Sequence, residues 1–352
     1  MNHVYRLTWN ESLQQYVPAP ETARGRHKQG GRARRRLAGA AVAAALMGAA
    51  AGALALPAGG QVSSGAASIT TGNTPGGGTL TLKQSSQTLA VNWQGFNIAG
   101  NETVNFVQPN ASAIALNRVL GSDASAIYGK LNANGQVFLL NPNGILFGKS
   151  AEVNVGGLVA STLNLSDADF VAGKRTFGAV GGAGAGAGVG VGVSNLGRIT
   201  ADGGYIAFLG AKVSNQGTLQ ANLGTVALAA GQQSTLDFAG DQLIRVQVDQ
   251  GALNALAENG QLIAADGGTV ILTAGAAESL VSAVVNNSGL IRARTLENRA
   301  GVISLLGDMR SGLVHVGGTL DASAPDGGNG GKIDTSAAHV KVADGARDAH
   351  TA

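Results

Sequence analysis

The chain has 352 residues, of which 55 are glycine, 44% are apolar, 13% are charged and none is cysteine. This composition excludes an all-helical globule, because helix propensity and helix packing need more leucine, glutamate, lysine and large core residues. The absence of cysteine excludes a disulfide framework, a thiolate metal site and a cysteine nucleophile. Short apolar runs between the glycines argue against disorder and favour many short strands joined by tight turns.

The net charge of +3 is divided unevenly along the chain. Residues 1–36 hold eight basic and two acidic side chains, so the remainder carries a net charge of −3. The basic character therefore belongs to the N-terminal segment, and the body of the chain has no electrostatic footprint for a nucleic acid.

The N-terminal segment has the order of a secretory signal. Residues 1–36 form an extended, basic n-region, and residues 37–55 form an alanine-rich apolar stretch that ends in a cleavage site of the A-x-A kind. A transmembrane helix is the alternative, since about 20 residues can span a bilayer. The glycines and alanines of the stretch favour a signal peptide that is cleaved. We therefore expect an exported protein with no stable transmembrane segment after cleavage.

The start of the chain follows the pattern M-N-K-x-Y-R-x-x-W-N. The matching positions are Asn2, Tyr5, Arg6, Trp9 and Asn10. His3 stands where the pattern has lysine. The segment thus resembles the extended signal-peptide region of very large surface proteins of Gram-negative bacteria. The resemblance implies that this extension modulates export across the inner membrane.

After the leader, short apolar runs recur between Gly, Asn, Asp and Pro residues, as strands between turns do. They lie at 79–83, 89–93, 137–140, 153–155, 205–209, 225–228, 270–273 and 302–306. Two stretches without turn residues, 252–258 and 276–284, are expected to form short helices. Residues 179–193 are a low-complexity Gly-Ala-Val stretch, either a loop or a silk-like strand, and the entropy of glycine favours the loop.

A repeated unit gives the strongest indication of the fold. It begins at Asn195, returns at Asn215 after 20 residues, and returns again at Asn287. A period of this length marks a solenoid, because one unit has too little apolar surface to fold alone. Stacked units pair their strands in parallel around a narrow apolar core. Asparagines at equivalent positions then stack into a ladder that satisfies backbone groups of the turns.

These patterns predict an all-β protein, a right-handed parallel β-helix with an N-terminal cap and small β elements outside the helix. We expect residues 56–194 to form the cap and the first coils. Residues 195–343 are expected to form the regular repeats, and residues 344–352 an irregular tail.

The clearest motif is Asn141-Pro142-Asn143-Gly144-Ile145. Pro142 fixes the first corner of a turn and Asn143-Gly144 tolerates left-handed backbone, so a tight turn is expected on physical grounds alone. The segment also resembles the N-P-N-G-I signature of the two-partner-secretion domain of filamentous haemagglutinin-type exoproteins. Stretches similar to the high-molecular-weight adhesin branch of that family lie at 91–98, 102–104, 116–119, 135–139 and 160–163.

This resemblance implies a route of secretion. The general secretory machinery exports the chain to the periplasm of a Gram-negative bacterium. There the POTRA domains of a dedicated outer-membrane β-barrel translocator recognise the unfolded chain, which then folds outside the cell. On this interpretation Asn141, Pro142, Asn143, Gly144 and Ile145 act in recognition or nucleation. The product is expected to be secreted or displayed on the cell surface and to act in adhesion, with a host-cell glycan or protein receptor as a further partner.

The body offers little for catalysis or for binding a cofactor or metal. Its histidines, His315, His339 and His350, lie in turn-like settings, and no coil-spaced set of acidic residues stands out. We therefore expect no enzyme, no cofactor and no metal. Two alternatives stay open: a secreted β-helix carbohydrate-active enzyme of the pectate-lyase kind, and a haem-binding or toxin exoprotein of the same secretion route.

Overall fold

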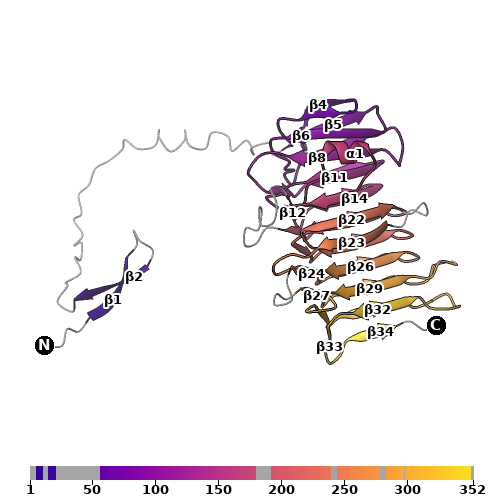
Figure 1. Ribbon diagram of the computed structural model, residues 1–352. Coiled ribbons are helices and arrows are strands. Elements are labelled where there is room, and N and C mark those ends of the chain that lie inside the picture. The colour runs from indigo at the N-terminus through magenta and orange to yellow at the C-terminus, as the bar shows by residue number, and fades with distance from the viewer. Residues whose placement is uncertain are drawn as a thin grey trace. The chain divides into compact units, whose positions relative to one another are not determined.

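The computed structural model describes residues 5–10, 15–20, 56–179, 192–238, 244–277, 283–296 and 298–349. The chain forms two compact units, Met1–Gly52 and Ala53–Ala352. Figure 1 shows the second unit as a stack of short strands, coil upon coil.

The second unit is a parallel β-helix whose described strands form three long sheets, here numbered 1 to 3. Sheet 1 contains β3 (Gln61–Ser64), β6 (Thr88–Trp93), β8 (Ile114–Val119), β11 (Gln136–Leu140), β14 (Gly157–Ser161), β18 (Tyr205–Gly210), β21 (Thr225–Ala230), β26 (Thr269–Ala274), β29 (Val302–Gly307) and β32 (Lys332–Ser336). Sheet 2 contains β4 (Ala67–Thr74), β5 (Gly77–Gln84), β7 (Thr103–Val107), β10 (Lys130–Ala133), β13 (Glu152–Asn154), β17 (Arg198–Thr200), β20 (Thr218–Gln220), β25 (Leu262–Ala264), β28 (Leu290–Arg292), β31 (Thr319–Asp321) and β34 (Arg347–Ala349). Sheet 3 contains β9 (Ser125–Ile127), β12 (Ile145–Phe147), β16 (Val193–Asn195), β19 (Lys212–Asn215), β24 (Leu256–Asn259), β27 (Val284–Asn287), β30 (Leu313–Val316) and β33 (His339–Val342).

Each coil passes through sheets 1, 3 and 2 in that order, as β11, β12 and β13 do. Equivalent strands of successive coils pair in parallel, so that Val137 lies beside Leu158 and Leu158 lies beside Ile206. Neighbouring coils thereby supply the backbone partners that such short strands cannot find within their own coil. The parallel β-helix predicted from the repeat is confirmed.

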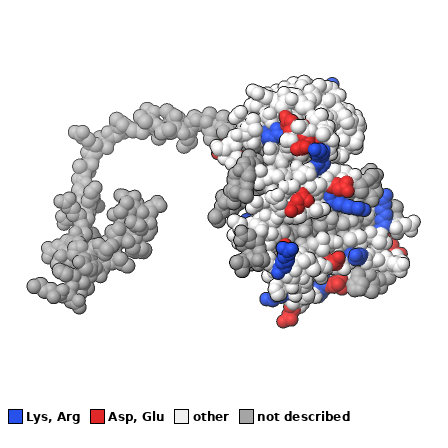
Figure 2. Space-filling model, in the orientation of Figure 1, with Lys and Arg blue, Asp and Glu red and all other residues white. Residues whose placement is uncertain are grey.

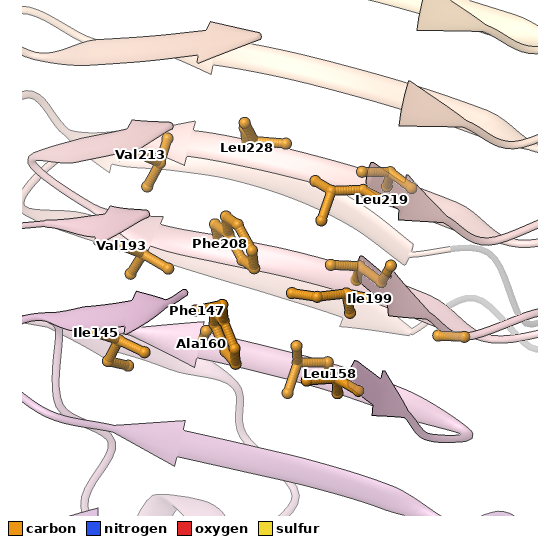
Figure 3. Close-up of a cluster of buried hydrophobic side chains, with 14 of the residues drawn as sticks. Ile145, Phe147, Leu158, Ala160, Val193, Ile199, Phe208, Val213, Leu219 and Leu228 are labelled. Carbon is orange, nitrogen blue, oxygen red and sulfur yellow. The ribbon is translucent and has the colours of Figure 1, made fainter. Parts of the chain in front are cut away.

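Inward-facing side chains fill a narrow core between the sheets. Figure 3 shows how equivalent positions stack: Ile145, Val193 and Val213 follow one another in register along sheet 3. The rings of Phe147 and Phe208 stack across this core, with centroids 6.0 Å apart and planes 6° from parallel. Each coil therefore buries its apolar side chains largely against the coils on either side of it.

A ladder of buried asparagines runs along one corner of the stack, where sheet 3 turns into sheet 2. Asn195 donates its side-chain amide to Oδ1 of Asn215 at 2.9 Å. Asn215 donates to Asn259 at 2.8 Å, and Asn259 donates to Asn287 at 2.8 Å. The corner is also tight, because a Cβ added at Gly217 would lie 2.2 Å from a backbone oxygen of the preceding coil. The asparagine ladder predicted from the repeat is confirmed.

The N-terminal end of the stack is closed by antiparallel strands. β3 pairs antiparallel with β6, and β4 pairs antiparallel with β5. These two pairings interrupt the parallel ladders at their first coil, so they form the cap that the sequence predicts.

A small layer, called the outer layer below, covers the outward side of sheet 1. It consists of α1 (Asp167–Val171), β15 (Thr176–Gly178), β22 (Gln233–Phe238) and β23 (Ile244–Gln250). β15 and β23 both pair antiparallel with β22. Their apolar side chains form a second buried cluster with the outward-facing residues of sheet 1, among them Phe138, Phe177 and Leu236. The β elements outside the helix are thus packed elements with a core of their own.

Two arginines fasten the outer layer to the β-helix. Arg118 of β8 forms a salt bridge with Asp167 of α1 at 2.8 Å. The Arg175 guanidinium lies 5.0 Å from the ring centroid of Phe170 and 5.8 Å from that of Phe138. Burial lowers the pKa of Arg175, and the facing aromatic rings favour its positive charge.

The prediction of short helices at 252–258 and 276–284 is wrong for the described residues of both stretches. Ala252 forms a parallel bridge with Ala276, and strand β24 begins at Leu256. The coils on either side offer backbone partners to these residues, and this pairing outweighs the local preference of alanine and leucine for a helix. Residues 278–282 lie outside the described residues.

The expected irregular tail contains a strand instead. β34 pairs in parallel with β31, so the coils continue past residue 343, and residues 350–352 lie outside the described residues. Most of the low-complexity stretch, residues 180–191, also lies outside them.

On the face of the second unit shown in Figure 2, basic and acidic side chains are interspersed on a largely uncharged surface. Opposite charges therefore offset one another locally on this face. Among the described residues, no helix has the length and apolar character needed to span a bilayer. The apolar stretch 37–55 is outside the described part of the chain.

Candidate functional site

The segment Asn141-Pro142-Asn143-Gly144 forms the corner between β11 and β12, which is the tight turn that the sequence predicts. The backbone N–H of Asn143 donates to Oδ1 of Asn141 at 2.9 Å, and that of Gly144 donates to the Asn141 carbonyl at 3.1 Å. Gly144 has a φ of 112°, in the region that favours glycine. Asn141 therefore closes the turn with both its side chain and its carbonyl.

The turn is also tied to the coil before it and to the coil after it. The Asn141 amide donates to the carbonyl of Asp123 and to Oγ of Ser125, both at 3.0 Å. The Asn143 amide donates to the carbonyl of Gly121 at 2.8 Å. In the other direction, the N–H of Ile145 donates to a backbone carbonyl of the following coil at 3.0 Å. The motif thus joins three successive coils.

Sequence reasoning missed the acceptors in segment 121–125. Two of them are main-chain carbonyls, which every residue carries, so no side-chain pattern marks them. The third acceptor is the hydroxyl of Ser125, a buried residue in the coil before the motif. Ser125 lies 16 residues before Asn141 and pairs in register with Ile145, so this serine was the one side-chain signal for the contact that the sequence contained.

Burial divides the motif into hidden and accessible parts. The side chain of Asn141 is 0% exposed and Ile145 is buried, whereas Pro142 and Asn143 are half-buried. None of the five residues has a titratable side chain, so the corner works through hydrogen bonds and shape. A partner that meets the folded domain would reach Asn143 in part and Asn141 not at all.

The leader motif falls mostly within the first compact unit's strand pair. Tyr5, Arg6, Trp9 and Asn10 belong to β1 (Tyr5–Asn10), which pairs antiparallel with β2 (Gln15–Pro20). Asn2 lies outside the described residues. The motif by itself predicts no secondary structure for this segment, and the structure adds the β1–β2 hairpin.

Two family models match the chain, one after the other. The model described as TPS secretion domain matches residues 53–346. The chain belongs to this family. The model described as Extended Signal Peptide of Type V secretion system matches residues 1–52. The two resemblances drawn from the motifs, to a two-partner-secretion domain and to an extended signal peptide, are confirmed.

Relatives in Haemophilus influenzae agree with this membership. Two proteins named heme/hemopexin-binding protein are 44% identical over 110 residues and 49% identical over 86 residues, or 31% and 24% of this chain. The matched parts span only 12% and 9% of the length of those relatives. The crystal structure of the HMW1 secretion domain is 27% identical, with a TM-score of 0.64, and the match covers 84% of each chain.

Membership in the TPS secretion domain family defines the route that the chain takes. It is exported through the periplasm and secreted from a Gram-negative cell, and the family implies a dedicated outer-membrane transporter as partner. Both matching family models describe secretion, and neither describes an enzyme. Among the described residues, no group of His, Asp and Glu lies together in a way that could hold a metal ion.

Proposed function

We propose that the Asn141–Ile145 corner directs this TPS domain through its transporter while the chain is still unfolded, and then fastens the early coils once the chain folds outside. The observation that carries the proposal is the burial of Asn141, whose amide is used entirely within the domain. Because the folded domain hides this side chain, the POTRA domains of the transporter would read it before folding. Afterwards the same amide would join neighbouring coils.

The first experiment measures secretion of Asn141→Ala and Asn143→Ala by cells that make the transporter. Secreted protein is expected to fall at least about tenfold while the periplasmic amount persists. The matched control is Asn154→Ala, which removes an exposed amide from the same coil and should leave secretion unchanged. Normal secretion of both motif variants would remove the recognition role.

A second experiment separates recognition from nucleation. The urea-unfolded parent and Asn141→Ala chains are diluted onto immobilised POTRA domains, and binding is recorded before either chain refolds. Weaker binding of the variant supports recognition of the unfolded chain. Equal binding combined with slower refolding assigns the motif to nucleation alone and contradicts the first half of the proposal.

For the exoprotein as a whole we propose a role in adhesion at the cell surface. Support comes from the stretches similar to the adhesin branch and from the likeness to the HMW1 secretion domain. Haem binding is the second candidate, favoured by the names of the two curated relatives. Adherence of cells that display the exoprotein, set against retention of the exoprotein on haem-agarose, discriminates between the two.

A further inference from the structure

The outward side of sheet 2 carries two grooves that the secretion motif does not use. One has a volume of about 500 Å³ and is lined by residues of β5, β7, β10 and β13 and by Asn134. The other has a volume of about 460 Å³ and lies at the corner where sheet 3 turns into sheet 2. The two grooves lie on successive coils of one sheet, since β13 contributes residues to both.

The first groove contains a row of three amides and one hydroxyl beside the apolar Val107 and Ala133. Thr81, Asn105, Asn132 and Asn154 occupy equivalent positions in four successive coils. The Asn132 amide donates to Oδ1 of Asn105 at 3.0 Å. Within the described residues, the Asn105 amide nitrogen, the Asn132 carbonyl oxygen and the Asn154 side chain have no further hydrogen bond. These groups offer both donors and acceptors at regular intervals to a ligand.

The second groove adds positive charge to this pattern. Lys130 forms a salt bridge with Glu152 at 3.1 Å, which offsets the groove's carboxylate. Lys149 and Arg198 line the same groove and are exposed, and neither forms an ion pair or side-chain hydrogen bond with any described residue. Among the described lining residues, two cations therefore face solvent, while the carboxylate of Glu152 already has Lys130 as a partner.

The corner glycines keep the second groove open. Gly197 and Gly217 line it, and a Cβ at Gly197 would lie 2.5 Å from the backbone oxygen of Gly148 in the coil before. A side chain at this corner is therefore excluded by the stacking of the coils. The exposed Gln216 and Gln261 add amides at the groove rim.

We propose that the outward side of sheet 2 binds an acidic linear polysaccharide, lying along the axis of the stack. The amide row suits the hydroxyl groups of sugars, and the planar fork of Arg198 suits a carboxylate or sulfate. Coils repeat about every 4.8 Å, similar to the advance of one hexose in an extended polysaccharide, so a periodic ligand meets a periodic surface. A single-stranded nucleic acid fits less well, because Phe106, the one aromatic residue among the described residues that line the grooves, is buried and offers no ring for base stacking.

This inference adds a ligand class to the adhesion role proposed above. It rests on that proposed function only in placing the ligand at the cell surface. It is independent of the transporter, because binding is measured on protein that has already been secreted. A failure of the secretion proposal would therefore leave this test unaffected, and the reverse also holds.

The test uses the secreted protein and three hexasaccharide probes: a heparin fragment, oligogalacturonate and neutral maltohexaose, each titrated by calorimetry. Both acidic probes should bind at least about tenfold more tightly than maltohexaose, with affinity that falls as salt rises. Arg198→Gln and Lys149→Gln should each weaken acidic binding severalfold, and Asn132→Ala should weaken it for both acidic probes.

The matched control is Lys341→Gln, which removes one exposed positive charge from β33 of sheet 3 and should leave binding unchanged. An equal loss in Lys341→Gln, equal affinity for maltohexaose, or no binding at millimolar concentration would overturn the proposal. So would equally tight binding of a hexaglutamate peptide, because the surface would then select charge and not sugar. All four substituted residues are at least partly exposed, and thermal unfolding of each variant confirms that the fold is intact.

Discussion

The indole N–H of Trp93 donates to Oδ1 of Asn117 at 3.0 Å, and both side chains are buried. The pair joins adjacent coils, because β6 and β8 are neighbours in sheet 1. Asn117 also donates to the carbonyls of Ala115 and Phe138, so its amide is fully used. This contact joins the first two coils, which precede the secretion motif in the chain.

We predict that Asn117→Ala lowers the free energy of unfolding by about 1–3 kcal/mol, because the indole N–H loses its buried acceptor. Tryptophan fluorescence during urea unfolding measures the change. The chain has two tryptophans, and the other, Trp9, lies in the leader, so the processed protein reports on Trp93 alone. An unchanged urea midpoint would falsify the assigned bond.

A second prediction concerns the contribution of the asparagine ladder to the stability of the fold. Asn215→Ala should lower the free energy of unfolding by about 1–3 kcal/mol, because buried amide groups of Asn195 and Asn259 each lose a partner. Asn154→Ala, which removes an exposed asparagine, should change it by less than about 0.5 kcal/mol. Urea titration by circular dichroism compares the two, and equal effects would contradict the ladder's role in stability.

The outer layer should open before the β-helix does when its core is damaged. Phe177 is 0% exposed, and Phe177→Ala should cost about 3–5 kcal/mol at this site. Hydrogen exchange is expected to accelerate in β15, β22 and β23 while the strands of sheet 3 keep their protection. Uniform acceleration across all three long sheets would show instead that layer and helix unfold as one unit.

The pH dependence of stability should contain a contribution from Asp266. Burial raises the pKa of this carboxyl, but hydrogen bonds from Arg294 and the charges of Arg292 and Arg294 outweigh burial and hold the pKa below its usual value. A carboxyl with a lowered folded-state pKa stabilises the fold above its unfolded pKa of about 3.9 and loses this effect as the pH falls through the folded value. Asp266→Asn should therefore be less stable than the parent at pH 7, and the difference should shrink below about pH 4.

Urea midpoints recorded from pH 7 down to pH 3 test this expectation. The control is Asp344→Asn, at an exposed position, which should follow the parent within about 0.5 kcal/mol at each pH. A difference between Asp266→Asn and the parent that stays constant with pH would point to lost packing in place of lost charge.

The repeating features of the fold could be predicted from sequence because the same residue pattern recurs in successive coils. The spacing from Asn195 to Asn215 fixes the register of two coils, and the buried ladder follows from it. The corner at Asn141 was predictable for a local reason, since proline and Asn-Gly define a turn in any context. The coil-to-coil bonds of Asn141 were not predictable, because main-chain carbonyls accept them.

The outer layer lay beyond sequence reasoning for a different reason. β15 and β22 pair although Thr176 and Thr235 are 59 positions apart, and the segment between them contains regular coils. The identity of Phe177 as an apolar residue does not indicate whether it packs inside the β-helix or in the second core outside sheet 1. The expected helix at 252–258 failed because a lone stretch of alanine and leucine cannot reveal that neighbouring coils will pair with it.

The pairing of β15 with β22 also determines how the domain resists pulling. Force applied at the C-terminal end detaches the last coils one at a time, each breaking only its contacts with one neighbour. When the detachment reaches β23, the antiparallel sheet and the rings beneath Arg175 should yield together, and we expect the force needed to rise sharply. Optical-tweezer traces should record this as one large step after a series of small ones, and the early coils behind it should remain intact until that step.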